Sequence, residues 1–586
     1  MGTASSFSSI QAYLRALHDT PSRILHRAIS TTSSDHEDIS RSWSHSGGQL
    51  RKTLTWPDLI SLGIGGMVGA GIFVTTGRAS SQLAGPACIF SYALAGLCAL
   101  LSALCYTEFA VELPVAGGAF SYIRATFGEF PAFLAGANLI LDYLLSNAAV
   151  ARSFTPYLST ALGLSSYDWR ITLPSLPPGF NELDPLAVFI VLSITVVICH
   201  STKKSSLVNI GLTFFHLLFI MFVIAMGFWK GNWKNLVVAG NPNIHSSGFF
   251  PYGPSGVFNA AAMVYVSYIG YDAVSTMAEE VRNPSEDIPI GVYGSVIIVT
   301  LLYSLMATSL SFLLPYDMID PDAPFSAAFA GTWVSRVVGA GACFGILTSL
   351  IVSMLGQARY ICVIGRSGLV PYWFARVDPS SSTPSNATVS MGTVNAASLL
   401  FLLVVISGLI TALIACCADL DILLGLVSIG TLFVFYMVAN ALVYRRYASS
   451  RETSQITTLV FLMAFTFVCV ALALSWRLVG WGRYVGVGAL ATLAVGMVAV
   501  FRSTVVEART PDVWGVPMMP WVACGSIFLN IFLIGALADR SFFRFGVFSA
   551  FVVVGYLVYG VHASFDAHSG RSVRFGSPCQ KENEII

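Results

Sequence analysis

The sequence G-I-G-G-M-V-G-A-G-I-F occupies residues 63–73, inside the first long apolar run of the chain, and carries five glycines in nine residues. Each interior glycine costs a helix about 1 kcal/mol relative to alanine, so the segment is poorly suited to continuous helix. One interpretation is a face of small residues that lets a second helix approach closely. The other is an unwound segment at mid-membrane, which survives only where it is buried or lines a cavity. Its free N–H groups and the positive end of the following half-helix would then suit a small anion such as a carboxylate.

The composition is that of a membrane protein. The chain has 586 residues, of which 55% are hydrophobic and only 10% are charged, and its mean hydropathy is +0.73. Soluble domains carry about 25% charged residues, and so few charges cannot cover the water-facing surface of a chain this long. We therefore predict an all-α polytopic protein embedded in the lipid bilayer. The net charge of +1 gives no reason to expect nucleic acid as a partner.

The sequence shows no pattern typical of an enzyme or a metal site. The 11 cysteines lie mostly in apolar runs without a C-x-x-C pair, so we interpret them as small core residues. We find no nucleotide loop, metal cluster or nucleophile arrangement, and expect no enzymatic activity, cofactor or metal. The first 50 residues are polar and serine-rich, so the first span is expected to act as the uncleaved insertion signal.

About fourteen apolar stretches approach the roughly 20 residues that a membrane-spanning helix needs. They lie near residues 57–77, 86–112, 131–161, 185–200, 206–228, 255–279, 289–314, 334–356, 387–413, 421–443, 455–476, 481–501, 517–538 and 543–563. Twelve spans is the alternative count, because the fourth range is short and the ninth and tenth are separated only by a loop that Asp419 and Asp421 mark.

The basic residues indicate the orientation of the spans. With a cytoplasmic N-terminus, 21 of the 31 lysines and arginines fall on the inner side, as the excess of positive charge in cytoplasmic loops requires. The even span count then predicts a cytoplasmic tail at each end, residues 1–55 and 564–586. We expect the plasma membrane, with the vacuolar membrane as the alternative.

A second candidate break lies in the sixth span, which reads A-A-M-V-Y-V-S-Y-I-G-Y-D-A-V-S-T-M-A-E-E from Ala261 to Glu280. Gly270 and Asp272 lie deep in this otherwise apolar run. Spans one and six would correspond in an inverted five-plus-five repeat, and paired broken helices are the best sequence pointer to a transporter site. Carbonyls freed at Val266–Ile269 could accept an ammonium group, so the two breaks together describe an α-amino acid.

Charged residues inside the membrane are costly and are functional candidates by default. Asp272 is interpreted as a functional carboxylate, or otherwise as a cap for the helix break. Asp142 either faces a cavity or has a structural role. Glu108, near the inner end of the second span, either handles protons or makes a structural contact. Lys203 either snorkels to the interface or takes up and releases a proton, since desolvation lowers a lysine pKa.

Several motifs together resemble the cationic amino-acid transporter group of the amino acid–polyamine–organocation superfamily, particularly its plant members. The matching segments are residues 63–73, Y-T-E-F-A-V-E-L-P-V-A-G-G-A-F-S-Y (106–122), Y-I-G-Y-D-A-V-S-T (268–276), E-E-V-R-N-P-S-E-D-I-P (279–289), R-S-G-L-V-P (366–371) and L-V-S-I-G-T-L (426–432). They run through most of the first ten spans.

The resemblance implies a LeuT-like core of two inverted five-helix repeats over residues 56–445, followed by four accessory spans over residues 446–563. It implies that the substrate carboxylate binds in the first break and its amino group in the second. Asp142 stands where many relatives carry Glu, and Lys203 matches a lysine that lies against the first helix in proton-coupled relatives. The candidate substrate-binding residues are Met67, Val68, Gly69, Ala70, Gly71, Asp142, Val266, Ser267, Tyr268, Ile269, Asp272, Ser353 and Met354.

Our functional prediction is secondary active import of cationic or large neutral amino acids with protons, by alternating access. Lys203, Asp272 and Glu108 are the candidate proton-coupling residues, and Ser353 and Met354 are expected to shape the side-chain pocket. One alternative is a pH-independent exchanger or facilitator on an internal, vacuolar membrane. Another is an amino-acid-sensing receptor that has kept the fold. The expected partners are the amino acid, protons and the lipid bilayer.

Overall fold

The computed structural model describes residues 6–27, 52–114, 117–164, 169–177, 179–200, 205–241, 248–366, 396–448, 452–478, 480–511 and 513–566. Within them the chain is almost entirely helical, and each of the fourteen predicted ranges overlaps a helix or a pair of half-helices. The principal helices are α4 (Trp56–Met67), α5 (Ala70–Arg78), α6 (Cys88–Glu112), α7 (Gly118–Phe127), α8 (Glu129–Leu162), α9 (Pro185–His200), α10 (Ser205–Lys230), α11 (Gly253–Val264), α12 (Tyr271–Thr276), α13 (Pro284–Leu313), α15 (Trp333–Arg366), α16 (Ala396–Cys417), α17 (Leu420–Tyr447), α18 (Glu452–Trp476), α19 (Trp481–Thr504), α20 (Trp521–Ala536) and α21 (Asp539–Gly555).

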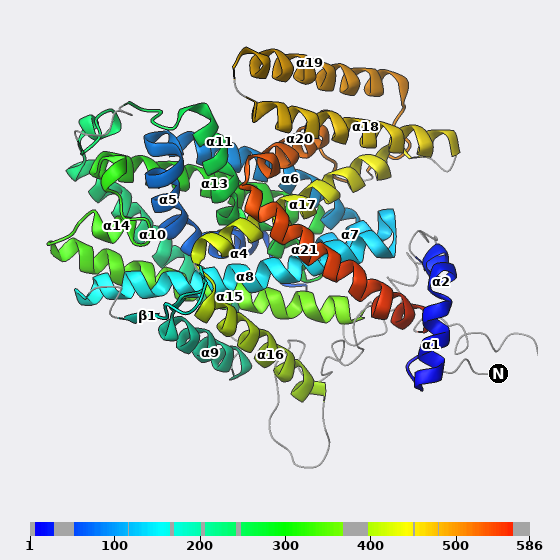
Figure 1. Ribbon diagram of the computed structural model, residues 1–586, viewed down its shortest axis with the longest axis horizontal. Coiled ribbons are helices and arrows are strands. Elements are labelled where there is room, and N and C mark those ends of the chain that lie inside the picture. The colour runs from blue at the N-terminus through cyan, green and yellow to red at the C-terminus, as the bar shows by residue number, and fades with distance from the viewer. Residues whose placement is uncertain are drawn as a thin grey trace, which may run out of the picture.

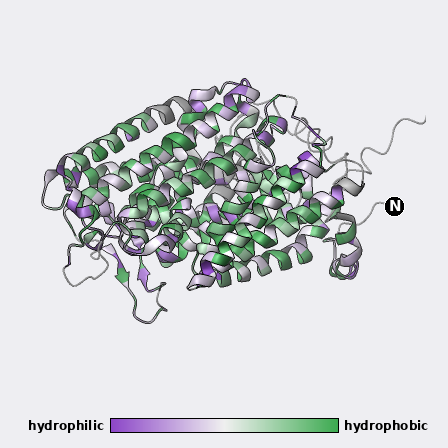
Figure 2. Cartoon of the chain, turned by 90° about the horizontal axis from the view of Figure 1, so that it is seen from above, coloured by the Kyte–Doolittle hydropathy of each residue, from purple (hydrophilic) through white to green (hydrophobic). Residues whose placement is uncertain are grey.

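The length and apolarity of these helices confirm a polytopic membrane protein. Among the described residues, nine helices are long and apolar enough to span a bilayer, and three further apolar helices are shorter. Helices satisfy their own backbone hydrogen bonds, which is why they can cross lipid. Figure 2 shows hydrophobic residues along the helices, with hydrophilic residues more frequent toward the helix ends and loops.

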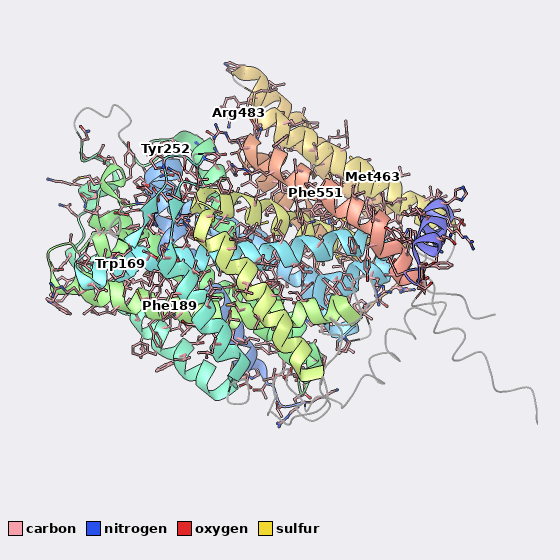
Figure 3. The ribbon with its side chains drawn as sticks, turned by 60° about the horizontal axis from the view of Figure 1, so that its bottom comes forward. Trp169, Phe189, Tyr252, Met463, Arg483 and Phe551 are labelled. Atoms are coloured by element: carbon pink, nitrogen blue, oxygen red, sulfur yellow. The ribbon has the colours of Figure 1, made fainter. Side chains whose placement is uncertain are left out.

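The helices form an inner group that carries the breaks and an outer group that faces outward. The long helices α8 and α15 pack side by side, while α13 packs against α4 and α6 (Figure 1). Phe189 on α9, Met463 on α18 and Phe551 on α21 project from the outside of the bundle (Figure 3), and each is at least 67% exposed. Such large exposed apolar side chains are typical of a surface covered by lipid.

Both ends of the described chain lie at the same end of the bundle. The N-terminal segment contains α1 (Ile10–His18) and α2 (Thr20–Arg27), which lie beyond the end of α21 and across its direction (Figure 1). The Ser6 hydroxyl lies 2.8 Å from a carboxylate oxygen of Asp566, and the Ser6 N–H donates to the other oxygen at 2.6 Å. An even number of membrane crossings agrees with this pairing.

The opposite end of the bundle carries a short hairpin and several ion pairs. Strands β1 (Ile171–Thr172) and β2 (Glu182–Leu183) pair antiparallel. Arg78, at the end of α5, pairs with Asp322 at 2.8 Å and also contacts Asp421 at the start of α17. These contacts join helices that are far apart in the sequence, so they help to fix the end of the broken first helix.

Candidate binding site between two broken helices

The first predicted break is present, and it is short. Helix α4 ends at Met67, Val68 leaves helical geometry (φ −81°, ψ 108°), and Gly69 is extended (φ −175°, ψ −133°) before α5 begins. Gly63, Gly65 and Gly66 remain inside α4. The earlier glycines serve close packing instead: a Cβ at Gly63 would lie 2.5 Å from the Ser295 hydroxyl oxygen on α13. The glycine-rich segment therefore contains a close-packing face, at Gly63, and a helix break, at Val68 and Gly69.

The second predicted break is also present. Helix α11 passes into a 3-10 turn over Tyr265–Tyr268, Ile269 is extended, and α12 starts at Tyr271. Gly270 between them has φ +133°, which residues with a Cβ rarely adopt. Glycine at this position is therefore required by the backbone conformation of the break.

The two breaks lie against each other. A Cβ at Gly270 would lie 2.6 Å from the carbonyl carbon of Gly66, and one at Gly71 would lie 2.7 Å from the Cα of Ser267. The hydroxyl of Tyr303, on α13, lies 2.6 Å from the Met67 carbonyl oxygen and 2.9 Å from the Ser267 carbonyl oxygen. One buried tyrosine thus bridges the backbones of both interrupted helices.

A cavity opens beside the two breaks. Its walls come from both broken helices and from α8, α15 and α17. The residues that line it are Gly66, Met67, Gly71, Thr75, Tyr143, Ser146, Ala149, Val150, Val266, Ile269, Gly270, Ala273, Ser349, Val352, Ser353, Gly356, Leu420 and Leu424. None of these described residues is charged, and the polar groups are hydroxyls and the backbone of the breaks.

Five predicted site residues line this cavity: Met67, Gly71, Val266, Ile269 and Ser353. The others lie around it. Val68 lines a second, smaller cavity and connects the two half-helices together with Gly69. Ala70 is the first residue of α5, and Met354 is buried on α15. The Tyr268 side chain points away, because its hydroxyl donates to the Tyr92 carbonyl oxygen at 2.8 Å.

The carboxylate of Asp272 holds the second break in place. One of its oxygens accepts the Gly270 N–H at 3.0 Å, and the other accepts the hydroxyl of Tyr143 at 3.1 Å. Tyr143 itself lines the cavity, so Asp272 is linked to the cavity through this tyrosine. The capping role considered for Asp272 is therefore realised in its contact with Gly270.

Asp142 and Glu108 have other surroundings. Asp142 accepts the hydroxyl of Thr431, on α17, at 2.9 Å and is not among the residues that line the cavity. Glu108 accepts two hydrogen bonds from Arg446, at 2.6 and 2.7 Å, and one from the Val516 N–H at 2.7 Å. These bonds engage both carboxylate oxygens and favour the structural interpretation of Glu108. Lys203 lies outside the described residues.

Four polar lining residues were not identified from the sequence, and one of them, Thr75, lies one turn after Gly71 on α5. Tyr143 directly follows Asp142, and Ser146 lies one turn further along α8, while Ser349 precedes Ser353 by one turn of α15. The signal that could have found them is helical spacing, since residues three and four apart share a face. Ser349 also packs tightly against the first break, because a Cβ at Gly69 would lie 2.4 Å from its hydroxyl oxygen.

The site has the chemistry to hold a small zwitterion. Gly71 lies in the first turn of α5, where unsatisfied N–H groups and the positive end of the helix favour an anionic group. Ile269, whose backbone is extended, also lines the cavity, and a backbone carbonyl oxygen freed from a helix suits a cation. An α-amino acid carries both groups on one carbon, which matches the contact between the two breaks.

Comparison with known proteins agrees with this geometry. The amino acid permease family matches residues 54–480, and the C-terminal region of such permeases matches residues 514–564. The chain is 60% identical to cationic amino acid transporter 6, chloroplastic, and 58% identical to cationic amino acid transporter 7, chloroplastic, both from Arabidopsis thaliana. Each alignment covers 97% of this chain and 96% of the relative. Cationic amino acid transporter 1 of the same plant is 43% identical over 96% of this chain and 91% of its own length.

These comparisons correct one prediction from the sequence. The plasma membrane was expected, but the two relatives that match at 60% and 58% identity are both named chloroplastic. The prediction was wrong because the excess of basic residues reports only which side of a membrane a loop occupies. It carries no information about which membrane receives the protein.

Proposed function

The chain belongs to the cationic amino acid transporter family of amino acid permeases, and from this membership we propose that it moves amino acids across a chloroplast membrane together with protons. The observation that carries the proposal is the cavity beside two helix breaks that meet backbone to backbone. Alternating access would expose this cavity to one side of the membrane and then to the other.

The proposed substrate pose follows from the two breaks. The α-carboxylate accepts hydrogen bonds from the N–H groups at the start of α5, next to Gly71. The ammonium group lies at the second break, close to the carbonyl oxygen of Ile269. The side chain then extends toward α8 and α15, where Tyr143, Ser146, Ser349 and Ser353 provide hydroxyl groups.

The uncharged lining bears on substrate choice. A cationic side chain placed in this cavity would find hydroxyls and carbonyl oxygens. The carboxylate of Asp272 does not line the cavity and is linked to it through Tyr143. An isolated charge is costly to bury without a paired opposite charge. We therefore propose that uncharged amino acids, including large ones, bind at least as well as arginine and lysine.

The proposed architecture is a ten-helix core of two inverted repeats over residues 56–445 and four accessory helices over residues 446–563, with fourteen spans in all. The matching breaks in the first and sixth spans support the repeat. The pairing of Ser6 with Asp566 at one end of the bundle supports an even number of spans. The four helices α18 to α21 follow the core and carry many of the exposed apolar side chains.

Two measurements test this proposal. Uptake of a labelled amino acid into proteoliposomes, competed by a panel of unlabelled amino acids, should identify substrates that share the α-carboxylate and α-ammonium groups. Binding of amino acids without any flux would instead indicate a sensing receptor.

Fractionation of plant cells that express a tagged chain should find it in chloroplast membranes, and recovery in vacuolar membranes would overturn that part of the proposal.

A further inference from the structure

The N-terminal helix α1 carries an apolar face that stays exposed in the described part of the chain. Ile10 and Leu14 are 80% and 59% exposed, and the half-buried Leu17 continues the same side of the helix. Residues three and four apart share one side of a helix, so these side chains form a stripe. The same spacing, shifted by one position, gives an exposed polar face made of Gln11, Arg15 and His18. Helix α1 is therefore amphipathic, and its apolar face is not the one that packs against the bundle.

A different face of α1 is fixed to the end of α21. The Tyr13 hydroxyl donates to the Val558 carbonyl oxygen at 2.9 Å, and Ala16, one turn further, is 1% exposed. The Thr20 hydroxyl oxygen, one turn further again, lies 3.3 Å from the Nε2 atom of His562. Residues 13, 16 and 20 share one side of the chain's helical path. This attachment fixes the direction in which the apolar stripe points.

The contacts on α21 place α1 at the level of the lipid headgroups. The candidate span Asp539–Asp566 has 28 residues, which makes a helix about 42 Å long. A bilayer has a hydrocarbon core of about 30 Å and measures about 40–45 Å with its headgroups. The last turns of the span, which include His562, therefore lie among the headgroups. They are held to the core of the bundle, because the buried Glu129, at the start of α8, accepts the Ser564 hydroxyl at 2.5 Å.

The orientation of α1 and the surface beside it both suit a bilayer. Helices α1 and α2 run across the direction of the long helices α8 and α15 (Figure 1), so they lie along the membrane plane. One side of α21 presents apolar side chains that are each at least 41% exposed: Phe543, Val547, Phe551, Val554 and Val558. This lipid-facing row ends at Val558, the residue whose carbonyl oxygen accepts the Tyr13 hydroxyl. The lipid-covered surface of the bundle therefore continues onto α1.

We propose that α1 is an interfacial helix, whose Ile10, Leu14 and Leu17 side chains insert at the boundary between the lipid headgroups and the acyl chains. Amphipathic helices with a basic polar face bind in this way, parallel to the membrane surface. Residues 6–27 contain three arginines and a single acidic residue, Asp19, a balance that favours a negatively charged lipid surface. The partner of the stripe is thus the bilayer itself, and α1 ties the end of α21 to the membrane surface.

The test measures the surroundings of single side chains in the full-length protein. The accessible native cysteines are replaced by serine, one nitroxide label is attached at a new cysteine, and the protein is reconstituted in vesicles of phosphatidylcholine and phosphatidylglycerol. Leu14→Cys reports on the stripe, Gln11→Cys on the polar face of the same helix is the matched control, and Phe551→Cys is the lipid reference. Oxygen concentrates in the bilayer, whereas a nickel chelate stays in water. The ratio of oxygen to nickel collisions should be at least about threefold higher for Leu14→Cys than for Gln11→Cys, and should approach that of Phe551→Cys.

The other outcomes overturn the inference, each in a distinct way. Equal collision ratios for Leu14→Cys and Gln11→Cys would mean that the stripe lies in water. A Leu14→Cys label shielded from both reagents, with spin–spin broadening that disappears on dilution with unlabelled protein, would mean that a second copy of the chain covers the stripe. Shielding that is unchanged by dilution would mean that another part of the same chain covers it. Ile10→Cys repeats the measurement one turn earlier and should give the same result as Leu14→Cys.

Discussion

Gly66 and Gly270 meet so closely that a Cβ on Gly270 would lie 2.6 Å from the carbonyl carbon of Gly66. The contact joins the two broken helices at the edge of the main cavity, which both residues line. Neither backbone can move toward the other, so a rearrangement of one break is transmitted to its partner. Substitution of Gly270 therefore tests whether contact between the two breaks is needed for transport.

Replacing Gly270 with alanine should abolish transport. The new methyl group would collide with the backbone of α4, and the residue would have to keep φ near +133°, a conformation that costs an alanine on the order of 1–3 kcal/mol. Initial uptake rates in proteoliposomes measure the effect, after fluorescence-detected size exclusion has shown that the variant is folded.

Gly248 offers a matched control for that substitution. It has φ +122°, but nothing lies within 4 Å of a Cβ built on it. Gly248→Ala therefore introduces similar backbone strain without a collision. Equal loss of transport in Gly248→Ala and Gly270→Ala would mean that contact between the breaks is irrelevant.

Tyr303→Phe should weaken the coupling of the two breaks. The hydroxyl contacts the carbonyl oxygens of Met67 and Ser267, and a typical hydrogen bond contributes about 0.5–1.5 kcal/mol. Loss of the hydroxyl should therefore lower the uptake rate by roughly two- to tenfold. Tyr293→Phe on the same helix is the control and should keep wild-type uptake, and a Tyr303→Phe variant as active as that control contradicts the bridging role.

Asp272→Asn should impair transport more than Asp142→Asn. Both Asp272 oxygens accept hydrogen bonds, from Gly270 and Tyr143, and asparagine can accept with only one. The unpaired donor costs about 1–3 kcal/mol. Asp142 accepts a hydrogen bond from the Thr431 hydroxyl, and the amide oxygen of asparagine can still accept it. Competition assays measure the substrate affinity of both variants. A larger loss of affinity in Asp142→Asn than in Asp272→Asn would place substrate recognition at Asp142.

Much of this fold was predictable from local sequence, and much of the site was not. Apolar runs located the helices, and Gly270 with Asp272 located the second break, because these signals act over a few residues. The glycines at 63–71 predicted a break but not its position. Gly63 is needed for contact with another helix, because a Cβ there would collide with Ser295, and the local sequence does not distinguish such a glycine from one at a break. Contacts such as Tyr303 with Met67, or Glu108 with Arg446, join residues separated by 236 and 338 positions, and no local pattern encodes them.

The Glu108–Arg446 pair should contribute stability. Its two hydrogen bonds are buried, and Arg446 also pairs with the partly exposed Glu507 at 3.3 Å. Removal of Glu108 therefore leaves a buried charge with a weaker partner, at a cost of up to about 3–5 kcal/mol. Glu108→Gln should lower the melting temperature in detergent markedly, and a double-mutant cycle with Arg446→Met should show strong coupling. Glu112, which pairs with Arg445 at 2.9 Å and whose side chain is 28% exposed, is the control, because such pairs contribute only about 0–1 kcal/mol. Equal melting temperatures for Glu108→Gln and Glu112→Gln would contradict the structural role.

The most direct test of the central claim is accumulation of a labelled amino acid in proteoliposomes with an imposed pH gradient. We expect accumulation above the external concentration while the gradient lasts, and we expect a protonophore or Gly270→Ala, but not Gly248→Ala, to abolish it. Uptake that only equilibrates the amino acid, at the same rate with and without the gradient, would contradict proton symport and leave an exchanger or facilitator.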